Sequence, residues 1–249
     1  MSPTRQPLLR LAHGERVPRH EHPHHQLAYP SHGVLEVSTD AGTWIVPPHR
    51  AVWLPTGIAH AHRAHGPTRL RTVNFEVGEP GPGFAGPVVL AVSPLLREVV
   101  VALTEDGRDA RRRERLRRVA LDEIRAVDEL PLHLPVPADD RLRAIADALD
   151  ADPADPRTLA EFGRAVGASE RTLSRLFRAQ TAMTFPQWRT QVRLHRALIL
   201  LASGAPVTAV AAECGYAGPS AFIQAFRQAF GTTPGRFGGR RPAEPATAV

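Results

Sequence analysis

The sequence has a single cysteine, no lysine and no long apolar run. One thiol cannot close an intramolecular disulfide or supply a CxxC metal site, so we interpret Cys214 as a small buried hydrophobe. Arginine, proline or glycine interrupts every apolar segment before the roughly 18 residues that a membrane helix requires. Residues 1–20 also lack the apolar core of a signal peptide. These absences predict a cytoplasmic protein without a membrane span.

Charge and histidine are unevenly distributed along the 249 residues. Residues 156–249 contain 12 arginines and only 4 acidic residues, a net charge of +8, whereas residues 1–155 contain 19 arginines and 21 acidic residues, a net charge of −2. Ten of the twelve histidines lie between His13 and His65. The composition, 43% hydrophobic and 22% charged, is that of a globular protein and excludes fibrous and disordered classes. Two functional halves are therefore predicted.

The N-terminal half has the alternating pattern of short antiparallel strands. Between residues 26 and 77, the turn signals SHG, DAG and PTG separate the segments QLAY, GVLEVST, GTWIVPP, RAVWLP and TRLRTVNFEV. Strands at this short and even spacing favour a small barrel or sandwich. Trp44 and Trp53 fall at alternating apolar positions, so we expect them in its core.

The middle of the chain has helical periodicity over residues 93–127. We expect these helices to connect two domains or to pair two subunits. Their RRRERLRR run is typical of a solvated helical face. The proline-punctuated stretch 130–140 marks the end of this linker. The predicted domains are accordingly a barrel over residues 1–90, a linker with candidate dimerisation helices over 91–138, and a second domain over 139–249.

The C-terminal part repeats one helical unit. LAEFGRAVG, from Leu159, aligns with VTAVAAECG, from Val207, and each copy keeps an apolar stripe at i, i+3, i+4 and i+7. A glycine-containing turn and a second helix follow each copy, which is the pattern of a helix-turn-helix. Ser169 has the type and position of an N-cap for the second helix of the first unit. Between the units, Thr184 opens a helix expected over residues 185–201, about 25 Å long, that would hold the units rigidly apart.

The second helix of each unit places polar residues opposite its apolar stripe. Arginine can fork onto guanine, glutamine can pair with adenine, and isoleucine can contact a thymine methyl group. We therefore expect the following residues to face base edges in a major groove: Arg171, Ser174, Arg175, Ser220, Ile223 and Gln224. Phosphate contacts are expected one turn further along and on the connecting helix, at Arg178, Arg227 and Arg189. The alternative for any one of these residues is a solvated helix face.

The stretch RTLSRLFRAQTAMTFPQWRTQVRLHRALILLASG, followed by VTAVAAECGYAGPSAFIQAFRQAFGTTPGRF, resembles the DNA-binding domain of AraC/XylS-type transcriptional regulators. The resemblance rests on both helix-turn-helix units, the linking helix, the PSAFIQAFRQAFG run and the TPGRF ending. This family reads two successive major-groove segments on one DNA face, and the resemblance gives that role to Arg171, Ser174, Arg175, Ser220 and Gln224. Double-stranded promoter DNA is the implied partner, and RNA polymerase is a further candidate.

The histidine-rich segment carries two other motifs. Reading from Gly14, the chain gives G-x5-His20-x-His22-x3-Gln26-x6-Gly33, and later Pro55-x-Gly57-x2-His60. These spacings resemble the two motifs of the cupin barrel over residues 10–77. The resemblance implies that a divalent transition metal (Zn, Ni, Fe or Cu) or another effector is held inside the barrel by His20, His22, Gln26 and His60.

The segment departs from the cupin pattern at three positions. Gln26 stands where a carboxylate is expected, and His49 and Ala64 replace a glycine and an asparagine of the second motif. Because an amide is a weaker metal ligand than a carboxylate, these departures weigh more against catalysis than against binding. A metal-free pocket whose histidines hydrogen-bond an organic effector stays open as the alternative. The remaining histidines of the two motif regions are expected at the surface, namely His24, His25, His62 and His65.

Together these patterns predict an α+β two-domain chain, with an N-terminal cupin-like antiparallel β-barrel and a C-terminal all-α domain of two helix-turn-helix units joined by a long helix. We interpret the chain as a homodimeric, sequence-specific transcription regulator, not an enzyme, whose barrel senses a small molecule or metal. One alternative is a metal-dependent cupin enzyme, an oxygenase or isomerase, fused to a DNA-binding tail. Another is an effector-independent DNA-binding protein whose barrel only dimerises.

Overall fold

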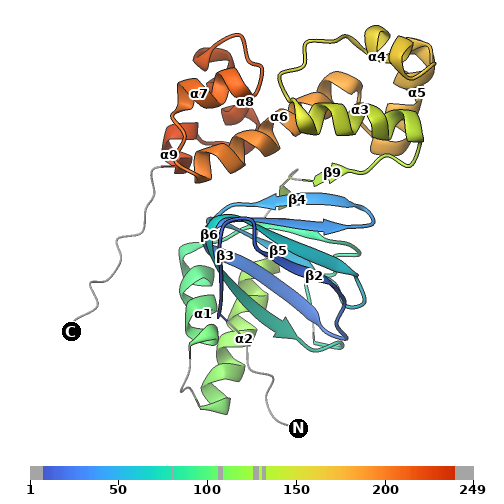
Figure 1. Cartoon of the computed structure of the whole chain (residues 1–249). Coiled ribbons are helices and arrows are strands. Elements are labelled where there is room, and N and C mark those ends of the chain that lie inside the picture. Colours follow the sequence, from blue (N-terminus) through green and yellow to red (C-terminus); the bar gives the residue numbers. More distant parts are fainter. Residues whose placement is uncertain (1–7, 80, 106–108, 126–128, 131–132, 239–249) are drawn as a thin grey trace.

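The computed structural model describes residues 8–79, 81–105, 109–125, 129–130 and 133–238. An antiparallel sheet with two helices forms one part, and the helices that follow form a second part packed on it (Figure 1). The strands are β1 (Leu8–Leu11), β2 (Arg16–His20), β3 (His25–Thr39), β4 (Gly42–Val46), β5 (Arg50–Leu54), β6 (His60–Phe75), β7 (Val88–Ala91), β8 (Glu129–Leu130) and β9 (His133–Pro135). The helices are α1 (Pro94–Thr104), α2 (Ala110–Arg125), α3 (Asp140–Ala151), α4 (Leu159–Ala165), α5 (Glu170–Thr181), α6 (Phe185–Ala202), α7 (Val207–Glu213), α8 (Pro219–Phe230) and α9 (Pro234–Gly238). The predicted α+β two-domain layout is confirmed.

Two long strands form the centre of the sheet. β3 and β6 pair antiparallel from His25 with Phe75 to Thr39 with His60. β1 and β2 pair with successive parts of β6, while β4 and β5 pair with β3. All pairs among the described strands are antiparallel, as predicted, but the path β1-β6-β3-β5-β7-β8, with β2, β4 and β9 beside it, does not return to β1. The cupin-like segment is therefore an antiparallel sheet whose described strands do not close into a barrel.

A bulge replaces one of the predicted turns. SHG was expected to separate two strands, but β3 continues through it, and its register against β6 shifts on both sides of His32. Pro30 has no N–H to give to the ladder. Gly33 has φ of +76°, and a Cβ there would lie 2.4 Å from Thr68 Oγ1. The expected turn was wrong because these residues bend one long strand without ending it.

The two helices that follow the sheet cover one of its faces (Figure 1). Ser93 caps α1, because its Oγ accepts a hydrogen bond from the Leu96 N–H at 3.0 Å. Leu96 of α1 and Ile124 of α2 join a buried cluster with Trp53 and Phe75 of the sheet. The apolar stripe of residues 93–127 thus packs on the sheet of the same chain. The domain boundaries at residues 90 and 138 stay a prediction, and the outer ends of the chain lie outside the described residues.

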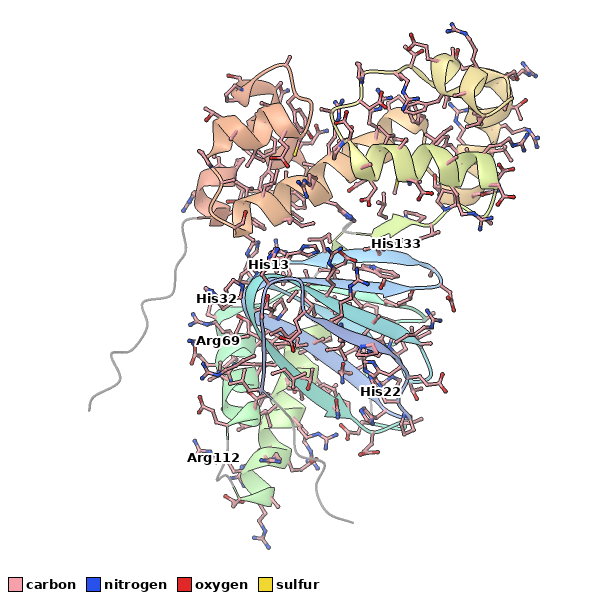
Figure 2. All side chains as sticks on the ribbon, viewed as in Figure 1. His13, His22, His32, Arg69, Arg112 and His133 are labelled. Atoms are coloured by element: carbon pink, nitrogen blue, oxygen red, sulfur yellow. The ribbon has the colours of Figure 1, made fainter. Side chains whose placement is uncertain are left out.

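The segment that enters the C-terminal domain joins the sheet as β9. It pairs antiparallel with β4, and the His133 ring stacks on Trp44 with 4.4 Å between centroids and 12° between planes. The His133 Nε2 also lies 2.9 Å from the Ala41 carbonyl oxygen. Figure 2 shows His133 at the edge of the sheet nearest the C-terminal helices. The entry to the helical domain is therefore fixed by backbone pairing and by ring stacking.

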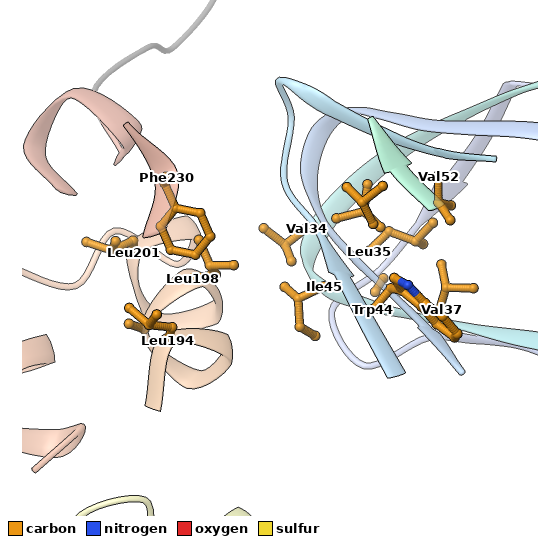
Figure 3. Close-up of a cluster of buried hydrophobic side chains, with 14 of the residues drawn as sticks. Val34, Leu35, Val37, Trp44, Ile45, Val52, Leu194, Leu198, Leu201 and Phe230 are labelled. Carbon is orange, nitrogen blue, oxygen red and sulfur yellow. The ribbon is translucent and has the colours of Figure 1, made fainter. Parts of the chain in front are cut away.

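The helical domain also packs directly on the sheet. Leu194, Leu198 and Leu201 of α6 form one buried cluster with side chains that include Val34 and Ile45 of the sheet. Figure 3 shows Leu198 on the side of α6 that faces Val34 and Ile45 of the sheet. The rings of His49 and Phe237 add an edge contact with 4.5 Å between centroids. None of the described helices combines the length and apolar character that crossing a bilayer requires.

Truncating Leu198, which is fully buried, should reduce the stability of the chain. We expect Leu198→Ala to lower the free energy of unfolding by about 2–5 kcal/mol, the usual cost of removing a buried leucine side chain. Leu95→Ala is the matched control, since Leu95 is 53% exposed, and should change it by about 0.5 kcal/mol or less. Urea unfolding of both variants measures this. If Leu198→Ala and Leu95→Ala lose the same free energy of unfolding, the packing described for Leu198 is wrong.

Candidate functional site

The first helix-turn-helix unit is α4 and α5. Ser169 caps α5, as predicted, because its Oγ accepts a hydrogen bond from the Thr172 N–H at 3.1 Å. Leu173 and Phe177 are fully buried on the inner face of α5, and Leu176 is half-buried. The predicted DNA-contacting side chains occupy the outer face: Arg171, Arg175 and Arg178 are exposed and Ser174 is half-buried.

The second unit is α7 and α8. Pro219 is the first residue of α8, and Phe222, Phe226 and Phe230 are buried on its inner face. The outer face lines an open hollow of about 700 Å³ with the side chains of Ser220, Ile223, Gln224, Arg227 and Gln228. Four of these five were predicted. Gln228 was missed, although it lies one helical turn after Gln224 and so extends the same face.

A second hollow, of about 500 Å³, lies where α4, α5 and the start of α6 meet. It brings together Ser174, Arg178 and Arg189, which the sequence placed in separate base-reading and phosphate sets. Arg189 is half-buried, and its guanidinium lies 4.5 Å from the centroid of the Phe185 ring and donates a hydrogen bond to the Arg157 carbonyl. Burial, and then the charge of Arg193, lower the pKa of Arg189. Its phosphate role stays a prediction.

Contacts between the units set the spacing of α5 and α8. Arg193 of α6 donates from Nε to the Pro153 carbonyl at 2.9 Å, which ties α6 to the loop before α4. Gly215 follows α7 with φ of +70°, and a Cβ there would lie 2.6 Å from the Ala154 Cα of that same loop. The backbone that follows α7 thus comes close to the loop that leads into the first unit, at a position that only glycine fits.

Histidines from β2 and β6 converge in the N-terminal domain. One ring nitrogen from each of His20, His60 and His62 lies within 4.8 Å of the other two. His20 and His60 are cross-strand partners, and His60 and His62 share one face of β6 because alternate strand residues do. The ring of His22 lies beside them, with its centroid 5.0 Å from that of His60. Figure 2 places His22 at the part of the sheet remote from the C-terminal helices.

Backbone carbonyls orient three of these rings. The Nδ1 atoms of His20, His60 and His22 each lie 2.8 Å from a carbonyl oxygen, those of Pro18, Ile58 and His24. Since a carbonyl only accepts, each Nδ1 carries the proton and each Nε2 is left with a free lone pair. The Nε2 atoms of His22 and His60 and the Nδ1 of His62 are buried and have no hydrogen-bond partner among the described residues.

The buried histidines are neutral at pH 7. Burial lowers the pKa of His60 to about 4. The hydrogen bond to the Ile58 carbonyl raises this pKa, and the neighbouring His20 and His22 lower it. Burial, and then the neighbouring rings, lower the pKa of His62 to about 3. Neutral imidazoles keep the lone pair that binds a metal or accepts a hydrogen bond.

The structure corrects two histidine assignments made from the sequence. His62 and His65 were expected at the surface, but only 3% of His62 and 9% of His65 are exposed. His65 Nε2 lies 2.7 Å from Glu36 Oε2. Although burial raises the pKa of Glu36, the hydrogen bond and charge of His65 hold it below its ordinary value. His24 and His25 are half-buried. The alternation in His60-x-His62 was the signal that would have placed His62 beside His60.

Gln26 is buried, and its amide nitrogen is engaged with a neighbouring strand residue. Its Nε2 donates to Asn74 Oδ1 at 3.2 Å, and its Oε1 has no partner among the described residues. Cys214 is fully buried, and burial raises the pKa of its thiol to about 12, as expected of an inert hydrophobic position. The histidine cluster is therefore built from His20, His22, His60 and His62.

Comparisons with known proteins agree with both halves of this description. A helix-turn-helix domain model matches residues 162–240, and a model of the AraC-like ligand binding domain matches residues 10–120. The HTH-type transcriptional regulator NimR of Escherichia coli K12 is 33% identical over 226 residues, covering 88% of this chain and 81% of NimR. RipA of Corynebacterium glutamicum, also an HTH-type transcriptional regulator, is 40% identical over 103 residues, covering 41% of this chain and 31% of RipA. The structure of ToxT from Vibrio cholerae matches with a TM-score of 0.41 and 8% identity, covering 94% of this chain and 97% of ToxT.

A methyl group at Gly215 should disturb the spacing of the two units more than one at Gly167. Both glycines have positive φ, so each alanine variant should lose about 1–2 kcal/mol of stability through backbone strain. Gly167 has open space around it, whereas Gly215→Ala must also push against Ala154. We expect Gly215→Ala to be the less stable variant by urea unfolding. A larger loss in Gly167→Ala would contradict the contact.

Proposed function

Because this chain belongs to the AraC family of HTH-type transcriptional regulators, we propose that α5 and α8 read two successive major-groove segments on one face of promoter DNA. The chain is a DNA-binding transcription regulator with an N-terminal ligand-binding domain. The observation that carries the finer proposal is that each unit buries the apolar side of its second helix and leaves polar side chains of the opposite side accessible.

The chemistry of the two outer faces supports base reading. On α5, the forked guanidinium groups of Arg171 and Arg175 suit guanine, and Ser174 adapts to several bases. On α8, Gln224 suits adenine and Ile223, which is 36% exposed, suits a thymine methyl group beside Ser220. The phosphate contacts fall to the arginines Arg178, Arg189 and Arg227.

Electrostatics supplies the attraction to any DNA sequence. Residues 156–249 carry a net charge of +8, all of it from arginine. Cations neutralising phosphates release counterions, so binding should weaken steeply as salt rises. The acidic N-terminal half, with a net charge of −2, has no such attraction. DNA is thus bound by the C-terminal domain.

The sheet provides a route by which an effector, a small molecule or a metal, acts on DNA binding. His62, Val37, Trp44 and His133 are successive cross-strand partners on β6, β3, β4 and β9. Such partners share one sheet face, and three strand spacings separate His62 from His133 by about 14 Å. β9 leads into α3, and α6 packs on the sheet. If an effector shifts this row of residues, the helical domain should change its position, and the fraction of the protein that is able to bind DNA should change with it.

The enzyme alternative is less well supported. The relatives are named as transcriptional regulators, which favours regulation over a metal-dependent oxygenase or isomerase with a DNA-binding tail. Substrate turnover that His20→Ala or His60→Ala abolishes would support the enzyme alternative.

We also propose that the protein acts in the cytoplasm as a homodimer, on promoter DNA and RNA polymerase.

Selection of bound sequences from a random DNA pool tests the proposal. The purified full-length protein is used alone, with chelator, and with added Zn²⁺ or Ni²⁺. We expect an enriched motif of two elements about 10 base pairs apart, because adjacent major-groove segments on one face repeat with the helical turn. A single enriched element, or no enrichment under any of these conditions, would contradict two-groove reading.

Arg175→Ala should weaken discrimination at one base pair of the selected site. The expected loss is about 1–3 kcal/mol, confined to that position. Arg227→Ala is the matched control, since removing a phosphate contact should weaken binding evenly on all sequences and reduce the salt dependence by about one charge. Binding titrations on the selected site, its single-base variants and random DNA measure both. If Arg175→Ala loses the same binding free energy on selected and on random DNA, Arg175 does not read a base.

A further inference from the structure

The histidine cluster has the features of a preformed ligand site rather than of a hydrogen-bonded core. Its rings come from two paired strands and from the segment just after β2, so they are held by the sheet. Three buried ring nitrogens, on His22, His60 and His62, lack a hydrogen-bond partner among the described residues. Buried polar atoms are nearly always paired, so several unpaired nitrogens in one cluster need a common partner.

That partner must accept lone pairs from several imidazoles. The carbonyls of Pro18, Ile58 and His24 hold the Nδ1 protons of His20, His60 and His22, which leaves the Nε2 atoms as acceptors or ligands. A carbonyl on the second nitrogen is the arrangement that orients metal-binding histidines and raises their basicity. The cluster thus has ligands and the groups that orient them.

We infer that His20, His60 and His62 bind one divalent late first-row transition-metal ion, with His22 beside them as a fourth imidazole. Nitrogen donors suit Zn²⁺, Ni²⁺ or Cu²⁺, whereas Mg²⁺ and Ca²⁺ require oxygen ligands. Ligand nitrogens on one tetrahedral Zn²⁺ lie about 3.3 Å apart, given bonds of about 2.0–2.1 Å. The nitrogens here lie within 4.8 Å of one another, so small side-chain rotations close the site.

This set differs from the one that the cupin motifs imply. Gln26 occupies the position of the motif carboxylate, but an amide oxygen suits Mg²⁺, Ca²⁺ or Mn²⁺ better than the late transition metals that imidazole favours. His62, at a position that the second motif leaves unspecified, supplies the third imidazole from the strand position two residues after His60. The two sets therefore make opposite predictions for Gln26 and His62. That the ion is the effector of the regulator rests on the proposed function, whereas its binding does not.

Equilibrium dialysis of the full-length protein against Zn²⁺, with Mg²⁺ in parallel, tests the site without any DNA. We expect one Zn²⁺ per chain and no Mg²⁺. Replacing even an orienting partner of a metal ligand typically costs 10–100-fold in affinity, so His20→Ala, His60→Ala and His62→Ala should each lose at least that. Gln26→Ala and His32→Ala, which alters an exposed histidine of the same sheet, should bind as the unaltered chain does.

Thermal unfolding shows whether each variant still folds. Zn²⁺ should raise the Tm of the unaltered chain and of His32→Ala, and leave that of His20→Ala unchanged; His20 is half-buried, so its truncation disturbs the core least. Unchanged Zn²⁺ affinity in the His20, His60 and His62 variants, or an equal loss in His32→Ala, would overturn the site. So would loss of binding in Gln26→Ala with retention in His62→Ala. Failure here leaves DNA selection by the C-terminal domain intact, so the two proposals are tested separately.

Discussion

The packing of α6 against three partners is the constraint on which the rest of the structure depends. The helix is 18 residues long, or about 27 Å. Trp188 and Val192 in its first half are buried with the first helix-turn-helix unit, whereas Leu194 and Leu198 are buried with the second unit and the sheet. Because a helix is stiff over this length, one element fixes both the distance between α5 and α8 and their position on the sensor domain.

The N-terminal domain combines an apolar sheet with one polar cluster. One face of the sheet packs against α1 and α2, and further sheet residues pack against α6. The imidazoles of His20, His60 and His62 lie apart from both junctions, in a neutral form that burial imposes on His60 and His62. In the proposed function, a ligand bound there would act at a distance, through the strand row that ends at His133. The paired backbones of the sheet would then connect that site with the DNA-binding helices.

The sequence predicted the C-terminal domain better than the N-terminal one, for physical reasons. Helix ends are local: Ser169 and Thr184 cap their helices as expected, because capping needs only residues three positions away. The sheet depends on distant pairing, so the Pro30 and Gly33 region was mistaken for a turn, and the strands before residue 20 were not anticipated. His62 was misplaced for the same reason, since its burial follows from pairing with Val37 of β3. The docking of Leu198 could not be predicted, because its apolar pattern equally suits a helical core.

The spacing of the two DNA elements is the most direct test of a rigid double reader. The affinity of the full-length protein is measured for a selected site and for versions with one to ten base pairs inserted between its elements. If α6 holds α5 and α8 as described, about 5 added base pairs turn the second element to the opposite DNA face, and affinity should fall to that of a site with one element. If α6 is rigid, adding ten base pairs should not restore the affinity either. Affinity that stays constant across the series would contradict the account.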